Sequence, residues 1–223
     1  MLRYPSRMSP PRRPYHHGDL RRALLDASLE LMEAEGLGAL SLREVARRAG
    51  VTHQAPYHHF ADKGALIAAI VAEGFGLLRD EMLRQRAKAG PGAAARLAAI
   101  GVGYVGFALE HPAHFRVMFR PELAGTETSP EHREITTEAY RLLEESVAAC
   151  VAEGLASRAD QQALVLLSWS LVHGLAALWL DGPLAVSPDS ARVEPRALAQ
   201  SVLGLFSRLL GAPRRSSPAR RRR

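Results

Sequence analysis

The most constraining feature of this sequence is a pair of very short helical segments between residues 41 and 60, separated by a glycine. Residues 41–44, Ser-Leu-Arg-Glu, match a capping box, in which the serine hydroxyl and the glutamate carboxylate satisfy each other's free backbone N–H groups. Gly50 ends the helix that starts there, and Thr52 is placed to cap the next segment, 53–60. Two short helices joined by a tight turn predict a helix-turn-helix.

Longer helices before and after this pair follow from the spacing of apolar residues. The first spans about 19–35, with Asp19 as its N-cap and Gly36 at its end. No segment alternates polar and apolar residues for long enough to be a convincing strand. We therefore predict an all-α fold, a three-helix helix-turn-helix domain followed by a helical bundle. The further helices are expected at about 63–87, 93–109, 112–119, 131–154, 160–180 and 195–210.

The formal net charge of +6 is distributed unevenly along the 223 residues. The first 22 residues hold six Arg and one Asp, the last twelve hold six Arg, and the residues between them sum to −5. We predict a flexible basic arm at 1–18 and a disordered Arg-rich tail at 212–223. Beside a helix-turn-helix the arm can reach into the minor groove, and the tail can add non-specific attraction to DNA. Solvated disorder is the alternative for both.

In a helix-turn-helix the second helix lies across the phosphate backbone and the third enters the major groove, which admits one α-helix. The exposed face of segment 53–60 would then read the bases. Gln54 can pair with adenine edges, the His side chains can donate to or accept from base edges, and Tyr57 can reach a phosphate or a thymine methyl group. The candidate DNA-binding residues are Ser41, Arg43, Thr52, His53, Gln54, Tyr57, His58 and Lys63.

Two stretches together resemble the DNA-binding domain of the tetracycline-repressor (TetR) family. They are Ser-Leu-Arg-Glu-Val-Ala-Arg-Arg-Ala-Gly-Val-Thr at 41–52 and Tyr-His-His-Phe-Ala-Asp-Lys-Gly-Ala-Leu at 57–66. The resemblance covers residues 19–78, with the helix-turn-helix motif at 42–61. It implies a homodimer of all-helical subunits that represses transcription until a small molecule binds. It also implies that Lys63 contacts a phosphate, where its charge and the helix dipole act together.

Pro56 departs from the family pattern, which more often has an aliphatic residue at this place. Proline lacks a backbone N–H and disfavours α geometry at the residue before it, here Ala55. With Thr52 as N-cap, Pro56 occupies the fourth helical position and removes the first i to i−4 hydrogen bond. We therefore expect a distorted start to the third helix, which affects the base contacts of His53 and Gln54.

The C-terminal part, 79–211, is similar to a TetR-type domain named for its Trp-His-Gly motif, here Trp169, His173 and Gly174 together with segment 111–123. The resemblance implies that this domain binds the effector and forms the dimer. Apolar side chains at helical spacing are core residues by default, but some must line any pocket. His173 is either a hydrogen-bonded core residue, which we favour, or a ligand contact. The candidate pocket residues are Phe75, Tyr104, Phe107, Met118, Phe119, Trp169 and His173.

The sequence gives little support for a metal site or for catalysis. His111 and His114 flank Pro112, a spacing that could hold a metal only with ligands from elsewhere, and a helix start is the preferred interpretation. A nucleophile, a base and an orienting group do not lie close together anywhere in the sequence. We therefore predict neither an enzyme nor a catalytic, metal or cofactor site. Cys150 lies in an apolar run and is expected in the core of a protein from a reducing compartment, the cytoplasm.

Residues 161–180 form a 20-residue stretch without a formal charge, long enough to cross a bilayer. The stretch contains polar side chains and has no Lys or Arg cluster beside either end, so we expect a helix buried in a bundle or in a subunit interface. No signal peptide fits the Arg- and Pro-rich start of the chain.

The sequence thus predicts a ligand-responsive repressor that binds double-stranded, pseudo-palindromic operator DNA as a homodimer. The dimer helices would be 160–180 and 195–210. The recognition helices of the two subunits would have to lie about 34–36 Å apart to dock together. A ligand that prefers another separation would shift the population away from DNA. The operator and the effector are not identifiable from the sequence.

Overall fold

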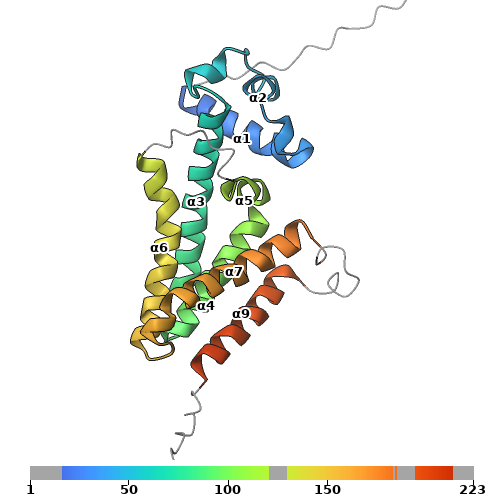
Figure 1. Ribbon diagram of the computed structural model, residues 1–223. Coiled ribbons are helices and arrows are strands. Elements are labelled where there is room, and N and C mark those ends of the chain that lie inside the picture. The colour runs from blue at the N-terminus through green and yellow to red at the C-terminus, as the bar shows by residue number, and fades with distance from the viewer. Residues whose placement is uncertain (1–16, 121–129, 183, 185–193, 213–223) are drawn as a thin grey trace, which may run out of the picture. The chain divides into compact units, whose positions relative to one another are not determined.

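The structure, a computed structural model, describes residues 17–120, 130–182, 184 and 194–212. Every regular element in these ranges is a helix, so the predicted all-α fold is confirmed. Apart from His17, Gly18 and Ala212, the predicted arm and tail lie outside the described residues. The elements are α1 (His17–Glu35), η1 (Leu37–Ala39), α2 (Leu42–Arg48), η2 (Ala55–His58), α3 (Lys63–Ala87), α4 (Ala93–Glu110), α5 (Pro112–Met118), α6 (Pro130–Ala152), η4 (Arg158–Asp160), α7 (Gln161–Leu180) and α9 (Pro195–Gly211) (Figure 1).

The chain forms two compact units, Met1–Lys63 and Gly64–Arg223. The division falls at the first turn of α3, whereas the boundary expected after residue 78 lies in the interior of the same helix. A DNA-binding domain of 19–78 therefore remains a prediction.

In the first unit, α1 packs against η1 and α2. Leu24, Leu31 and Val45 have no exposed surface and form the centre of its core. α1 begins at His17, two residues before the predicted N-cap, so Asp19 lies in the first turn instead. An acidic residue is favourable at either place, and the residue type alone therefore could not fix the first helical residue.

Ser41 is the N-cap of α2, and its hydroxyl accepts the backbone N–H of Glu44 over 3.2 Å. The reciprocal half of the predicted capping box does not form among the described residues. The Glu44 carboxylate instead accepts from the Arg47 guanidinium, with Nε 2.9 and 3.0 Å from its two oxygens. Gly50 follows the helix at φ +69°, a left-handed conformation that favours glycine and ends α2 where the sequence predicted.

The third helix is shorter than expected: it is the single 3₁₀ turn η2, with Gln54 rather than Thr52 at its N-cap. The N–H of Tyr57 bonds to the Gln54 carbonyl three residues back, over 3.1 Å. Because Pro56 lacks an N–H and restrains Ala55, the α-type pattern starts only when the Phe60 N–H reaches the Pro56 carbonyl over 2.9 Å. The expected distortion at Pro56 is present and extends over the whole turn.

In the second unit, α4 is the central helix and packs against α6, α7 and α9 (Figure 1). Phe107 and Ala108 on α4 are buried, as is Cys150 on α6, so the predicted core position of the cysteine is confirmed. Burial raises the pKa of the Cys150 thiol to about 11. Helix ends lie within a few residues of their predicted positions because Pro, Gly and charged residues mark them.

α4 and the segment 158–180 that contains α7 are each long and apolar enough to cross a membrane, by length and composition alone. The core helix of a water-soluble protein passes the same test. α4 is such a core helix, whereas α7 is only partly buried and exposes Leu166, Leu167 and Leu178. The bundle therefore buries only part of α7, and the prediction that a subunit interface covers the rest stays a prediction. The face with these leucines is apolar and open in the isolated chain.

Candidate DNA-binding surface and apolar cavity

The structure places all eight candidate DNA-binding residues on the surface of the first unit: Ser41, Arg43, Thr52, His53, Gln54, Tyr57, His58 and Lys63 are exposed. Buried and exposed side chains occur together in this segment: Pro56 and Phe60 are buried, whereas Tyr57 is 56% exposed. The buried pair anchors the turn, and the guanidinium of Arg21 lies 5.6 Å from the centre of the Phe60 ring. The polar side chains of η2 are thereby presented to solvent.

The basic residues of this unit differ in their partners. The Arg47 side chain is held by Glu44, and the Arg48 guanidinium lies 3.9 Å from the Glu35 carboxylate. The hydrogen bond from Arg47 lowers the pKa of Glu44, which therefore stays ionised and offsets the arginine charge. Among the described residues Arg43 and Lys63 have no such ion pair. These two side chains and Arg21 beside Phe60 thus carry positive charge that no ion pair among the described residues offsets.

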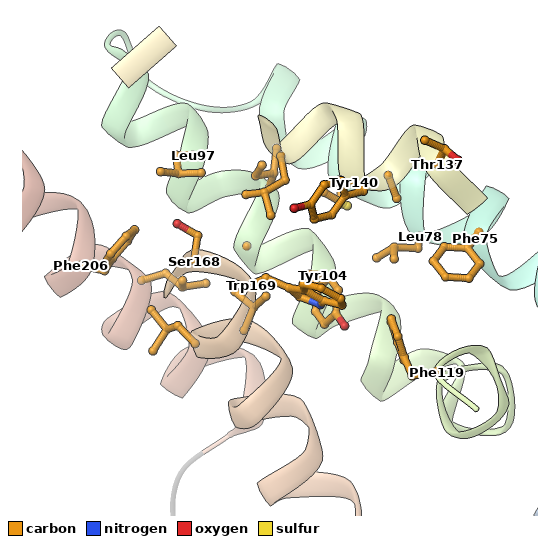
Figure 2. A pocket seen from close by; sticks show the side chains of 18 residues that line it. Phe75, Leu78, Leu97, Tyr104, Phe119, Thr137, Tyr140, Ser168, Trp169 and Phe206 are labelled. Atoms are coloured by element: carbon orange, nitrogen blue, oxygen red, sulfur yellow. The ribbon is translucent and has the colours of Figure 1, made fainter. Parts of the chain in front are cut away.

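The second unit contains a cavity of about 360 Å³ between five helices (Figure 2). Its walls come from α3, α4, α6, α7 and α9, with Phe119 just beyond the end of α5. A cavity of this size is within the range of small-molecule sites. The lining residues are Phe75, Leu78, Met82, Leu97, Ile100, Gly101, Tyr104, Phe119, Thr137, Ala139, Tyr140, Leu143, Ser168, Trp169, Leu171, Val172, Leu203 and Phe206.

Four of the seven candidate pocket residues, Phe75, Tyr104, Phe119 and Trp169, line this cavity. The other three do not. Phe107 is buried in the core, the Met118 sulfur packs so close to Gly74 that a Cβ there would lie 2.5 Å from it, and His173 lies on the other side of Tyr104.

Sequence reasoning missed Ser168, Val172, Tyr140 and the residues of α9. On α7 the cavity is lined by Ser168 and Val172, which are four residues apart on one helix face, together with Trp169. The Trp-His-Gly motif had instead suggested the neighbouring face, which holds Trp169 and His173. Helical spacing defines both faces, and nothing in the sequence favoured one over the other.

His173 is a hydrogen-bonded residue of the apolar interior, as the sequence analysis favoured. Its Nδ1 lies 2.8 Å from the Tyr104 hydroxyl, and its ring contacts Phe115, Phe119 and Trp169. Burial raises the pKa of Tyr104 far above the neutral range, so its hydroxyl keeps the proton. Burial also lowers the pKa of His173, which favours the neutral ring, and the tautomer of this ring sets which of the two groups donates in the hydrogen bond.

Acid should destabilise the second unit through His173. Because its folded pKa lies below the ordinary 6.5, the unfolded chain binds the proton more readily. The stability gained from the neutral ring is complete above about pH 6.5 and is lost as the pH falls toward the folded pKa, by up to about 1.4 kcal/mol per unit of difference. Urea unfolding at about pH 7.5 and about pH 5.5 should show a larger loss for the wild type than for His173→Asn.

The variant is necessary for this comparison because burial and the neighbouring His114 also lower the pKa of His111. The difference between the wild type and His173→Asn isolates the contribution of His173. Equal losses in the two proteins would contradict the assignment.

His111 is the N-cap of α5, and Pro112 is the first residue of that helix, as the preferred interpretation of this segment had it. His114 is buried, with its Nε2 3.4 Å from a carboxylate oxygen of Glu73. No group of three or more His, Cys, Asp or Glu with metal-site geometry occurs in the described part of the chain.

A helix-turn-helix with an exposed polar turn, joined to an all-helical unit with an apolar cavity, defines the helix-turn-helix transcription regulators. Residues 24–70 match the family model described as "Bacterial regulatory proteins, tetR family". Residues 97–211 match the model described as "Tetracyclin repressor-like, C-terminal domain". The chain belongs to the TetR family of DNA-binding transcription regulators, in agreement with the sequence resemblance. Membership points to a regulator rather than an enzyme.

Individual relatives agree with this assignment. The HTH-type transcriptional regulator BetI of Cronobacter sakazakii is 32% identical over 152 residues, which cover 63% of this chain and 75% of BetI. A solved protein of unknown function from Rhodococcus sp. RHA1 is 31% identical with a TM-score of 0.72, over 90% of this chain and all of that chain. FadR of Bacillus subtilis in complex with stearoyl-CoA is 17% identical with a TM-score of 0.62, over 83% and 97%. This last likeness concerns the fold alone.

Proposed function

We propose that the protein is a ligand-responsive repressor that binds pseudo-palindromic operator DNA as a homodimer and is released by a small molecule. The observation that carries the proposal is the cavity of about 360 Å³ in a unit separate from the helix-turn-helix. The cavity lining is largely apolar with a few polar side chains, which is typical of small-molecule sites. FadR, which shares the fold, has been solved with stearoyl-CoA, so the fold can hold a small molecule.

The homodimer is supported by the open apolar face of α7 and α9. Leu166, Leu167 and Leu178 on α7 and Leu205 and Leu209 on α9 are each about half exposed or more. Leu167 and Leu178 are eleven residues apart, three helical turns, and so share one face of α7. A second copy that presents the same face would form a four-helix interface with two-fold symmetry.

The two-fold symmetry of such a dimer accounts for a pseudo-palindromic operator. Each subunit would place its η2 turn in the major groove of one half-site, with the two turns about 34–36 Å apart. A ligand bound more tightly by the state with another separation lowers the fraction that fits DNA. The cytoplasm, where the operator DNA is accessible, is the compartment in which this protein would act.

A pull-down of sheared genomic DNA with the purified full-length protein tests the proposal. Selective retention of a few fragments at moderate salt, and their release by a small-molecule extract of the same cells, is the expected result. Retention without any preference among fragments would contradict the repressor. Retention that no extract changes would contradict the ligand response.

Lys63→Ala should weaken binding to the retained fragment by about fivefold to tenfold per subunit, since each subunit loses one phosphate contact. The slope of log affinity against log salt should fall by about one per subunit. Lys88→Ala is the matched control, because Lys88 is the second lysine of the chain and is also exposed, in the other unit. If both variants bind equally well, Lys63 has no part in DNA binding.

Tyr57→Ala should reduce the preference for the retained fragment over unrelated DNA, because Tyr57 is the most prominent side chain of η2 and can reach a thymine methyl group or a phosphate. Competition with unrelated duplex DNA measures this preference. An unchanged preference would assign base reading to the other residues of the turn.

A further inference from the structure

The lining of the cavity restricts the chemistry of its ligand, if the protein is ligand-responsive as proposed. None of the 18 described lining residues is Asp, Glu, Lys, Arg or His. An ion placed there would lose its hydration without gaining a partner of opposite charge, which costs several kcal/mol. The cavity therefore favours an uncharged ligand over an anion or a cation of the same size.

The Tyr104 hydroxyl, which lines the cavity, already has a hydrogen-bond partner in the chain. It lies 2.8 Å from Nδ1 of His173, and burial favours the neutral form of both groups. A ligand that engages Tyr104 has to compete with this bond. The hydrogen bond between Tyr104 and His173 is therefore part of the cavity wall, and these two groups already have a partner in each other.

Ser168 is different. It is 6% exposed and lines the cavity from α7, and its hydroxyl has no hydrogen-bond partner among the described residues. A buried hydroxyl without a partner costs about 1–3 kcal/mol, a cost that a ligand acceptor would remove. Rotation about the Cβ–Oγ bond turns the proton of this hydroxyl without moving the oxygen.

The walls around this hydroxyl are not uniform. Figure 2 shows Phe75, Tyr104, Phe119, Tyr140 and Trp169 toward one end, while Leu97, Ser168 and Phe206 lie toward the other. Most of the labelled aromatic rings lie at the first end, whereas Ser168 lies at the second end together with Leu97 and Phe206. Its hydroxyl is thus a buried polar group without a partner among the described residues, in a largely apolar space.

We infer that the effector is an uncharged, largely apolar molecule with one hydrogen-bond acceptor, which binds the Ser168 hydroxyl while its apolar body fills the cavity. Three observations carry this inference: the absence of charge in the described lining, the mutually satisfied Tyr104 and His173, and the buried serine without a partner. Ser168 determines specificity in this arrangement, since its buried hydroxyl has no partner among the described residues, and most of the remaining contacts are apolar and select by shape.

Three ten-carbon probes test the inference: 1-decanol, decanoate and decyltrimethylammonium. Binding is followed by the fluorescence of Trp169 in full-length protein that carries Trp179→Phe, since these are the two tryptophans of the chain. We expect 1-decanol to bind at least about tenfold more tightly than either ion. Ser168→Ala should weaken 1-decanol by about threefold to tenfold and leave the ions unchanged.

Ala139→Phe fills the cavity from α6 and should abolish 1-decanol binding, whereas Ala148→Phe, on an exposed position of the same helix, should not. Thermal unfolding of every variant checks that it is folded. Equal or tighter binding of an ion, no binding of 1-decanol to folded protein, or full affinity in Ser168→Ala would overturn the inference.

The DNA fragment retained by the protein separates this inference from the proposed function. Tight binding of 1-decanol without release of DNA would leave the ligand class standing and contradict the ligand-responsive repressor. Release of DNA by decanoate or by decyltrimethylammonium, with 1-decanol inactive, would support the repressor and overturn the ligand class.

Discussion

Replacing both Leu167 and Leu209 by glutamate should convert the protein from a dimer to a monomer and lower its affinity for operator DNA at least about 100-fold. In the isolated chain these leucines are 57% and 67% exposed, on α7 and α9. In the monomer the two glutamates stay in water, so they change its folding stability little. In a dimer, four carboxylates would have to leave water and would repel one another, which costs more than the lost apolar contacts alone.

The loss of DNA affinity follows from the loss of the second reading surface. A dimer binds its second half-site as an intramolecular event, whereas a monomer gains half the contacts and none of this advantage. Light scattering gives the mass of the particle, and a DNA titration at fixed salt gives the affinity. Leu83→Glu is the control, because Leu83 is an exposed leucine of α3 outside this face. A double variant that stays dimeric would place the interface elsewhere.

The exposed leucines also explain why the sequence was ambiguous about residues 161–180. An uncharged helix is compatible with a membrane span, a bundle core or an interface, because all three remove apolar surface from water. The sequence pattern alone cannot show which of these three surroundings covers the helix. The structure narrows the choice by showing that one side of α7 packs on α4 and that the opposite face holds Leu167 and Leu178. A subunit interface, as in the proposed homodimer, would cover this face, and the Leu167 and Leu209 variants test it.

The course of the chain could be predicted well because local signals mark it. Gly50 has φ > 0 at the end of α2, and Pro112 fits the first turn of α5, so each of these two boundaries has a residue that favours that place. The third helix was the exception. Pro56 predicted a distortion of this helix. Whether the segment forms an irregular α-helix or one 3₁₀ turn depends on how Pro56 and Phe60 are buried, which is a tertiary effect.

The cavity could be predicted only in part for a related reason. Periodicity shows which residues of a helix share a face, but not whether that face meets a neighbouring helix or an empty space. Phe107 and Tyr104 lie three residues apart on α4, yet Phe107 is in the packed core while Tyr104 lines the cavity. The difference arises from how the neighbouring helices pack on α4. One close contact in this packing is at Gly103.

Gly103→Ala should lower the free energy of unfolding by about 1–3 kcal/mol, although alanine is the better helix former. A Cβ at this position of α4 would lie 2.8 Å from the Met82 Cα and 2.9 Å from the Glu81 carbonyl oxygen on α3. These are backbone atoms, so no side chain can turn aside and the two helices must separate. The gain in helix propensity is smaller than the cost of this displacement.

Gly76→Ala is the matched control, because Gly76 is also inside a helix and a Cβ there would meet nothing within 4 Å. It should raise the free energy of unfolding by about 0.5–1 kcal/mol. Urea unfolding of the two variants should therefore give shifts of opposite sign. Two shifts of the same sign would mean that α3 and α4 are free to adjust at their crossing. Met82 is also part of the cavity wall, so a rigid crossing here fixes the shape of the ligand site together with the stability of the unit.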